Sequence, residues 1–463
     1  MMKLISQTKK IFYIISGMLV VLIITGVHFS ADTYREDIRV KNPPIERIKR
    51  ILPADTVRSR LTFLVDSSCT ILDPACSLKD FFSALQALEE GKDTVITIVH
   101  LGDSHVQAGA FPGRMMRLMQ QQYGNAGRGW IAPLKISKSN EPDDYFISSS
   151  VKEWISGRAI QRNRKCPVGP GGLGIQTISP FVDLDVSIAP VNGAGYAFNQ
   201  AVLYRGDQSM PMVPTGNLKD SVQLLPGERP EIGGVVADTF RISCLTDSLQ
   251  LQSTRRKPGT DELLPAEMFT NLYYGLSLTN GEPGILYHSI GVNGAMFVNY
   301  TEEAYVRKLA LLKPSLLIIS LGTNETFGKR FQKAEFTGQI RAFLDLVEKW
   351  MPGTPVLLTT PPECYKRYWE NKKRKYTRNT LTEQAAAAIV QVAQEKGLAC
   401  WDLFAATGGR TSSEKWYTGK WMGADRIHFN KEGYSEQGIL LFRSLIKYKK
   451  EMEKGEMPAP ERR

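Results

Sequence analysis

The sequence predicts an α/β fold in which helices cover both faces of a parallel sheet and a β-rich segment interrupts the sheet domain. The first observation is a strand-like apolar run at residues 94–99, followed by a helical pattern. The second is a regular alternation of helices and strands after residue 302. The third is the loss of helical periodicity at residues 148–284, where short β-rich runs alternate with turns. Alternation of helices and strands is typical of a parallel sheet, because helices make the crossovers between parallel strands.

The first predicted strand ends at a candidate nucleophile. Residues 94–99 are all β-branched and mostly apolar, and their short length favours a buried strand over a helix. They lead into Gly102-Asp103-Ser104-His105, and a helical pattern follows at residues 114–123. Ser104 is therefore expected at the carboxyl end of a strand, where open α/β sheets bind ligands. Because glycine, aspartate and serine all favour turns, an ordinary turn is the alternative interpretation of this peptide alone.

The β-rich segment is interpreted as an inserted β-sandwich or jelly-roll domain at residues 148–284. Its predicted strands are separated by glycine- and proline-containing turns and lie at residues 181–188, 239–244, 248–253 and 273–278. Aromatic residues such as Trp154 and Tyr273 fit two roles: sugar platforms on a glycan-binding surface, or core residues of the sandwich. The sequence leaves both roles open.

The α/β pattern resumes after this segment. Helices are predicted at residues 302–312, 334–349 and 381–396, and strands at residues 316–321, 356–360 and 398–403. The α/β domain is therefore expected in two parts, residues 91–147 and 285–450, on either side of the insertion. The other predicted segments are an N-terminal anchor at residues 1–31, a connecting segment at 32–90 and a polar tail at 451–463.

A candidate catalytic base lies near the end of the α/β pattern. Asp425 and His428 are three residues apart, so the carboxylate can hold one imidazole nitrogen while the other faces a serine. A serine hydroxyl needs such a base, because it is a weak nucleophile until its proton is taken. The chain has only five histidines, which makes this placement informative. The alternative is that His428 caps the helix that starts near Asn430.

Two further peptides offer groups for an oxyanion hole. Asn324 follows the predicted strand at residues 316–321 and is expected on the same edge of the sheet as Ser104. A glycine around position 294 allows a backbone N–H to approach a substrate closely, because glycine has no side chain to block it. Acyl transfer builds negative charge on the carbonyl oxygen, and preformed donors stabilise that charge. Ordinary strand-to-loop connections are the alternative for both peptides.

Together the four peptides resemble the blocks of the SGNH (GDSL-type) hydrolase family. The resemblance implies that Ser104 is the nucleophile, His428 the base and Asp425 its orienting carboxylate. It also implies an oxyanion hole formed by the backbone N–H groups of Ser104 and Gly294 and by the side chain of Asn324. The second block is matched by residues 291–295, so Gly291 is the fallback for the oxyanion glycine.

The match departs from the family pattern at two positions and is closest to one branch. His105 stands where the family name has leucine, and Glu325 replaces the usual aspartate of the third block. His105, residues 123–127 and residues 425–434 resemble the envelope O-acetylesterases that act on polysaccharides, including peptidoglycan, and that can carry an inserted β domain. The expected function is hydrolysis of O-acetyl esters on a cell-envelope glycan, peptidoglycan in particular. A polysaccharide O-acetyltransferase, a lipase or thioesterase, and a noncatalytic glycan-binding protein are the alternatives.

A strongly basic segment at residues 366–378 is the main feature behind the net charge of +11. It follows a predicted strand end and contains Trp369, Lys372 and Arg374, which we interpret as candidate substrate-binding residues on a lid or groove wall. A solvated basic loop is the alternative. Nucleic acid is not an expected partner, because no nucleic-acid-binding fold accompanies the basic residues.

The N-terminus predicts export. An uncharged, mostly apolar run at residues 11–27 follows Lys3, Lys9 and Lys10, which favours an uncleaved anchor with the catalytic domain on the periplasmic side of the inner membrane. A cleaved signal peptide is the alternative.

The cysteines and the remaining residues predict no bound cofactor. Of six cysteines, Cys69 and Cys76 are the expected disulfide pair if the compartment is oxidising. No grouping of cysteines and histidines has the spacing of a metal site, and no phosphate-binding glycine loop is found in the sequence. Neither a metal nor another cofactor is therefore expected, and the sequence leaves the oligomeric state open.

Overall fold

The computed structural model describes residues 59–61, 70–189, 196–225, 227, 234–256, 260, 262–265, 271–328 and 331–455. All of them belong to the second of the two compact units into which the chain divides, Ile48–Arg463. The predicted anchor at residues 11–27 and the cysteine at position 69 lie outside the described residues. No helix in the described part of the chain has the length and apolar character needed to cross a membrane.

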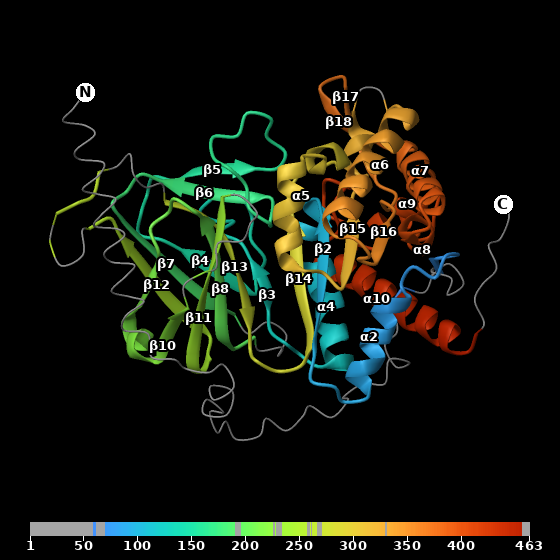
Figure 1. The fold of residues 1–463 in the computed structure, drawn as a ribbon. Coiled ribbons are helices and arrows are strands. Elements are labelled where there is room, and N and C mark those ends of the chain that lie inside the picture. Colours follow the sequence, from blue (N-terminus) through green and yellow to red (C-terminus); the bar gives the residue numbers. More distant parts are fainter. Residues whose placement is uncertain are drawn as a thin grey trace, which may run out of the picture. The chain divides into compact units, whose positions relative to one another are not determined.

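A six-stranded sheet forms the centre of the α/β domain (Figure 1). Its strands are β1 (Ile71–Leu72), β2 (Val95–Gly102), β14 (Gly284–Gly291), β15 (Leu316–Ser320), β16 (Val356–Thr359) and β19 (Ala399–Trp401). The strand order is β1-β19-β16-β15-β2-β14, and all neighbours are parallel except the β1–β19 pair. Every residue of β15 and β16 is buried, as expected for central parallel strands that are covered on both faces.

Two layers of helices cover this sheet (Figure 1). Helix α4 packs against α10 and α2 in one layer, and α6 packs against α5 and α7 in the other. Their bounds are α2 (Lys79–Glu89), α4 (Ala110–Tyr123), α5 (Glu303–Leu309), α6 (Lys333–Trp350), α7 (Leu381–Glu395) and α10 (Lys431–Glu453). The short helices are α3 (Ser104–Gln107), α8 (Leu403–Ala406), α9 (Ser412–Thr418) and the 3₁₀ turns η4 (Gly216–Ser221), η6 (Phe297–Tyr300), η7 (Ala310–Leu312) and η8 (Asn324–Phe327). The predicted three-layer α/β/α fold is thereby confirmed.

The β-rich segment lies between α4 and β14 in the chain and forms two antiparallel sheets (Figure 1). One has the order β10-β11-β8-β13-β6-β5, with β3 also paired to β13, and the other has the order β4-β7-β12-β9. The strands are β3 (Gly129–Ile131), β4 (Tyr145–Ser148), β5 (Ile155–Arg158), β6 (Leu173–Thr177), β7 (Phe181–Ile188), β8 (Phe198–Gly206), β9 (Val213–Thr215), β10 (Val222–Leu225), β11 (Val235–Thr246), β12 (Ser248–Thr254) and β13 (Asn271–Thr279). The pairing of β3 with β13 means that the antiparallel sheets begin before residue 148, where the sequence predicted the insertion to start.

One of the two proposed sugar platforms in this segment is a core residue. Tyr273 is only 1% exposed, and its hydroxyl lies 3.0 Å from Ser253 Oγ on the other sheet. Trp154 packs edge-on against Tyr273 and is partly buried. The platform interpretation of Tyr273 was therefore wrong, because its ring fills the space between the sheets.

The basic segment, expected as a lid or groove wall or else as a solvated loop, is a β-hairpin. Strands β17 (Tyr365–Glu370) and β18 (Lys373–Arg378) pair in an antiparallel register from Tyr365↔Arg378 to Glu370↔Lys373. The two connecting residues, Asn371 and Lys372, have φ angles of 48° and 58°. Positive φ at both central positions is the geometry that a tight two-residue hairpin requires.

The register of the central sheet brings three loop-bearing strand ends together. Gly291 at the end of β14 is paired with Gly102 at the end of β2, and Ser320 at the end of β15 is paired with Gly102 from the other side. The buried imidazole of His100 links the three strands near this edge. Its Nδ1 lies 2.7 Å from Tyr287 Oη on β14, and its Nε2 lies 2.7 Å from Ser320 Oγ on β15. The chain segments that follow β2, β14 and β15 therefore leave the sheet side by side.

Candidate active site

The nucleophile block passes directly from strand to helix. Ser104 is the first residue of α3, and Asp103 caps this helix by accepting a hydrogen bond of 2.9 Å from the His105 backbone N–H. Gly102 is required at the end of β2, because a Cβ there would lie 2.3 Å from Val106 Cγ2. The sharp connection leaves the Ser104 side chain at the edge of the sheet rather than within it.

The side chains of Ser104, His428 and Asp425 form a continuous hydrogen-bonded chain. Ser104 Oγ lies 2.8 Å from His428 Nε2, and His428 Nδ1 lies 2.6 Å from Asp425 Oδ2. The second carboxylate oxygen of Asp425 accepts from the backbone N–H groups of Ile427 and His428, both at 3.0 Å. Residues more than 300 positions apart in the chain thus meet in the geometry of a serine nucleophile with an oriented base.

The pKa values of the acid–base pair support this division of roles. Burial alone would raise the pKa of Asp425, but the hydrogen bonds from His428 and from the backbone lower it well below the ordinary aspartate range. The same hydrogen bond to Asp425 raises the pKa of His428 above its ordinary 6.5, against the opposing effect of burial. Asp425 is therefore ionised at neutral pH and stabilises a positive charge on the imidazole of His428.

Asn324 lies beside the nucleophile block, and both hydrogens of its amide are engaged. Its Nδ2 donates to Asp103 Oδ2 at 3.1 Å and to the Ala295 carbonyl at 3.0 Å. An amide NH₂ has two hydrogens to donate, so a substrate oxygen would have to replace one of these acceptors. Burial raises the pKa of Asp103 to about 7, although the hydrogen bond from the His105 N–H and the nearby His428 act to lower it.

Within the part of the chain that the structure describes, one N–H group of the turn after β14 has no hydrogen-bond acceptor, that of Gly294. Gly294 is exposed, has a φ of 80°, and a Cβ there would meet nothing closer than Ile160 Cδ1 at 4.0 Å. The other N–H groups of the turn donate within the protein: Val292 to Gly102 O (3.1 Å), Asn293 to Gln107 Oε1 (2.8 Å) and Ala295 to Val292 O (2.9 Å). Among the described residues, the N–H of Gly294 has no such acceptor and is available to a ligand.

Gly291, the fallback for the oxyanion glycine, has a packing role instead. It is paired in the β14–β2 ladder, and a Cβ at this position would lie 2.0 Å from the backbone nitrogen of Gln107 in α3. A glycine is needed here because the backbone of α3 touches the end of β14. The geometry therefore favours Gly294 over Gly291 as the donor.

The comparison with protein families agrees with this arrangement. Residues 261–435 match the GDSL-like Lipase/Acylhydrolase family. The chain contains a hydrolase domain of the GDSL-like family. The matched range includes Asn324, Asp425 and His428 and starts after Ser104, from which the β-rich segment separates it. The resemblance predicted from the sequence is confirmed.

Solved structures resemble the GDSL-like hydrolase domain and its β-rich segment to different extents. A peptidoglycan O-acetylesterase is 20% identical, with a TM-score of 0.63 and coverage of 82% of this chain and 99% of its own. The protein YxiM from Bacillus subtilis is 14% identical, with a TM-score of 0.32 and coverage of 66% and 90%. A GDSL-like lipase from Bacteroides thetaiotaomicron is 16% identical, with a TM-score of 0.24 and coverage of 35% and 76%. No curated protein matches the chain in sequence. The first structure shares its fold with most of this chain.

A buried imidazole behind the base was missed by sequence reasoning. His105 is 6% exposed, its Nδ1 lies 2.9 Å from Tyr434 Oη, and its ring centroid lies 5.4 Å from that of His428. Burial, aided by the nearby His428, lowers the pKa of His105 to about 3. A neutral ring thus supports His428 on one side. The departure from leucine at position 105 was the available signal, and its partner Tyr434 comes from α10, far along the chain.

Two more polar side chains join the blocks of the GDSL-like hydrolase domain. Gln107 accepts from the Asn293 N–H at 2.8 Å and donates to Ser139 Oγ and to the Asn140 carbonyl, both at 2.8 Å. Glu325, the departure in the third block, is buried and accepts from the Phe297 N–H at 2.9 Å. Burial raises the pKa of Glu325 to about 7. These contacts fix the loops after β14 and β15 relative to α3.

The three candidate substrate-binding residues lie on the β17–β18 hairpin. Trp369 is 64% exposed, and the Arg374 guanidinium lies 5.9 Å from its ring centroid. Lys372 is exposed in the connecting turn. Within the described part of the chain, no hydrogen bond or ion pair joins these residues to Ser104, Asp425 or His428. They stay candidates for contacts to a substrate that extends beyond the catalytic groups.

Proposed function

We propose that the chain is a serine-dependent carbohydrate O-acetylesterase that acts on O-acetylated cell-envelope glycan, with peptidoglycan as the favoured substrate. The observation that carries the proposal is the 2.8 Å contact between Ser104 Oγ and His428 Nε2, with Asp425 on the far side of the ring. The choice of substrate is supported by the fold shared with a peptidoglycan O-acetylesterase. The apolar run at residues 11–27 supports a location at the inner membrane, with the enzyme facing the periplasm.

The reaction would proceed in two balanced steps. In the first, His428 Nε2 removes the proton of Ser104 while Oγ attacks the acetyl carbonyl carbon, and His428⁺ then protonates the departing sugar oxygen. In the second, water loses a proton to His428 and attacks the acetyl-serine, and the proton returns to Ser104 Oγ as acetate leaves. Asp425 stays ionised throughout and stabilises the imidazolium of both steps.

The oxyanion of each tetrahedral intermediate would be bound by three donors. Gly294 contributes the N–H group of its exposed turn, and Ser104 contributes its own backbone N–H. Asn324 would contribute one amide hydrogen by releasing Asp103 or the Ala295 carbonyl, its present acceptors. Of these donors, the two backbone N–H groups are preformed, and preformed donors stabilise the developing charge more than the ground-state carbonyl.

Acetate release from O-acetylated peptidoglycan tests the proposal. We expect the Ser104→Ala variant to lose at least about 10³-fold in turnover, in line with the removal of other activated serines. Its circular dichroism spectrum is expected to match the wild type, and unlike the wild type it is expected not to react with a fluorophosphonate. Ser150→Ala, at an exposed serine of the β-rich segment, is the matched control.

Each alternative function predicts a different result. A transferase would form acetylated glycan from an acetyl donor and release little acetate. A noncatalytic protein would bind peptidoglycan but release no p-nitrophenol from p-nitrophenyl acetate. Hydrolysis of p-nitrophenyl acetate without acetate release from peptidoglycan would leave an esterase with a different substrate, and full activity of Ser104→Ala would refute the catalytic assignment.

A further inference from the structure

The β17–β18 hairpin extends from the hydrolase domain (Figure 1). Its sequence is strongly basic. Residues 366–378 contain seven lysines and arginines and one acid, Glu370. Lys375 pairs with Glu370 at 3.5 Å, and Arg378 pairs with Glu363 at 3.2 Å. The other five cations form no ion pair with any described residue: Lys366, Arg367, Lys372, Lys373 and Arg374. The hairpin therefore carries positive charge that no ion pair within the described part of the chain neutralises.

Strand alternation divides this charge between two faces. Alternate residues of β17 share a face with the residues directly opposite them on β18. One face carries Arg367, Trp369 and Arg374, because Trp369 is paired with Arg374 and Arg367 with Tyr376. The opposite face carries the neighbouring residues Lys366, Tyr368, Glu370, Lys373 and Lys375. The face with Trp369 includes two of the unpaired cations and the most exposed aromatic ring of the hairpin, at 64%.

The face with Trp369 is turned toward the loop that carries the catalytic acid and base. Tyr365 and Tyr376 belong to this face, and the Arg426 guanidinium lies 5.3 Å and 4.4 Å from their ring centroids. The Tyr365 N–H donates to the Arg426 carbonyl at 3.0 Å, and Tyr376 Oη donates to the Ala424 carbonyl at 3.2 Å. Since Arg426 lies between Asp425 and His428 in the chain, this face of the hairpin contacts the catalytic loop directly.

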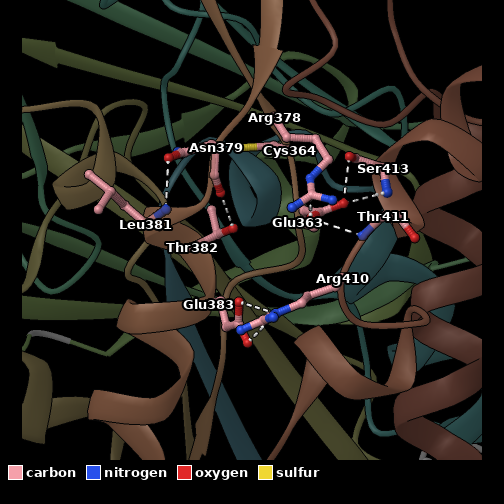
Figure 2. A network of polar contacts seen from close by, with 10 residues as sticks. All are labelled: Glu363, Cys364, Arg378, Asn379, Leu381, Thr382, Glu383, Arg410, Thr411 and Ser413. Atoms are coloured by element: carbon pink, nitrogen blue, oxygen red, sulfur yellow. Dashed lines mark hydrogen bonds and ion pairs between the residues drawn. The ribbon is translucent and has the colours of Figure 1, made fainter.

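The base of the hairpin is held by buried polar contacts (Figure 2). Glu363, just before β17, accepts hydrogen bonds from Ser413 and is paired with Arg378 at the end of β18. Asn379, just after β18, is fully buried and donates to Thr326 Oγ1 at 2.7 Å. These contacts fix both ends of the hairpin to α9 and to the loop that contains Asn324. The orientation of the hairpin is therefore set by the body of the domain.

We propose that the hairpin face bearing Arg367, Trp369 and Arg374 is a binding surface for an acidic glycan chain whose acetyl group is hydrolysed at Ser104. The inference rests on the proposed function. It specifies that the part of the substrate beyond the acetylated sugar is an acidic glycan chain. Arginines bind carboxylates through paired N–H groups, and the flat ring of Trp369 offers a stacking surface to a sugar. The stem-peptide carboxylates of peptidoglycan supply the negative charge.

The position of the face requires a polymeric ligand. Trp369 is four residues along β17 from Tyr365, roughly 13 Å at about 3.3 Å per residue. Tyr365 already lies at the base of the hairpin, against the catalytic loop. A ligand that reaches both Ser104 and Trp369 must therefore be longer than one sugar, and a small ester cannot use this face.

The test compares two double variants of the full-length protein. Trp369→Ala with Arg374→Ala removes one aromatic ring and one cation from the proposed face. Tyr368→Ala with Lys373→Ala removes the same kinds of group from the opposite face and serves as the matched control. For each protein, kcat/KM is measured on O-acetylated peptidoglycan, on neutral O-acetylated glucomannan and on p-nitrophenyl acetate.

We expect the first double variant to lower the ratio of kcat/KM for peptidoglycan to that for p-nitrophenyl acetate about tenfold, equal to about 1.4 kcal/mol. The control is expected to stay within twofold of the wild type on all three substrates. The effect is expected to be smaller on glucomannan, and added salt is expected to lower the wild-type ratio by screening.

Several outcomes would overturn this proposal. An equal loss in the ratio of kcat/KM for peptidoglycan to that for p-nitrophenyl acetate in both double variants would mean a nonspecific effect of charge. Equal losses on peptidoglycan and on the small ester would mean that the hairpin acts through the catalytic loop. An unchanged ratio, together with lost binding to phosphatidylglycerol vesicles, would identify a membrane contact instead. If the wild type released no acetate from peptidoglycan, the proposed function itself would fail, a result distinct from any of these.

Discussion

Replacement of Asp425 by asparagine tests the orientation of the catalytic base. One oxygen of Asp425 accepts from the backbone N–H groups of Ile427 and His428, and the other lies 2.6 Å from His428 Nδ1. An asparagine that keeps its oxygen toward the two backbone N–H groups must turn its NH₂ group toward Nδ1. His428 would then carry its proton on Nε2 and donate to Ser104 instead of accepting from it. The flipped amide would place NH₂ against two backbone donors, so neither orientation restores the site.

The expected loss is about 10⁴-fold in kcat, the scale seen when a triad aspartate is replaced without a change of geometry. This corresponds to roughly 5 kcal/mol of transition-state stabilisation. The free energy of unfolding is expected to change by only about 0–1 kcal/mol, because the Asp425 side chain is 47% exposed and water can solvate the substituted group. A large loss of rate with little loss of stability distinguishes a misoriented base from a damaged fold.

The assay is p-nitrophenyl acetate hydrolysis, combined with urea unfolding of each variant. Asp143→Asn is the control, because Asp143 is a nearby exposed acid in a surface ion pair with Lys431. We expect the control to keep its activity within twofold. Retention of more than a tenth of the wild-type kcat by Asp425→Asn would refute the proposal that this carboxylate orients His428.

Three further predictions follow from the same contacts. The raised pKa of His428 means that the base is protonated and inactive at lower pH, so kcat/KM should rise with pH with a midpoint above 6.5; a midpoint below 6.5 would contradict this. Tyr434→Phe leaves the buried Nδ1 of His105 without its 2.9 Å partner and should lower the free energy of unfolding by about 1–3 kcal/mol in urea, whereas an unchanged value would argue against the contact. Gly291→Ala places a Cβ 2.0 Å from the backbone nitrogen of Gln107, so α3 must move. The free energy of unfolding should fall by about 1–3 kcal/mol, and kcat/KM should fall as well. A wild-type free energy of unfolding in urea would contradict this prediction.

The elements with a strong periodic pattern could be predicted from the sequence. The strands expected at residues 94–99, 316–321 and 356–360 correspond to β2, β15 and β16, because each is a short and largely apolar run. The sheet buries every residue of β15 and β16. The helix expected at residues 381–396 corresponds to α7, whose alanine-rich sequence favours a helix. In these segments local pattern and tertiary environment agree, so the pattern is sufficient.

The hairpin and the support of the base could not be predicted in this way. β17 and β18 have mostly exposed side chains and many charges, so they lack the apolar alternation that marks a half-buried strand. Their pairing depends on positive φ angles at Asn371 and Lys372, neither of which is glycine. The contact between His105 and Tyr434 joins residues 329 positions apart and has no local pattern at all. Side-chain partners of this kind follow from packing, which a single sequence does not display.

The β-rich segment contributes contacts that position the candidate active site. The segment begins after α4 and ends before β14 in the chain. β14 nevertheless pairs in parallel with β2 from Gly284↔Val95 to Gly291↔Gly102, so both strands end at the same edge of the sheet. Residues that follow α4 also reach back to the site: Asn140 accepts hydrogen bonds from Gln107 Nε2 and from Asn293 Nδ2, and so braces α3 against the Gly294 turn. Because that turn holds the available N–H group, the segment that separates Ser104 from the rest of the hydrolase domain in sequence also helps to set the distance between Ser104 and the proposed oxyanion donor, Gly294. Shortening the β-rich segment should therefore impair catalysis even if the six-stranded sheet still forms.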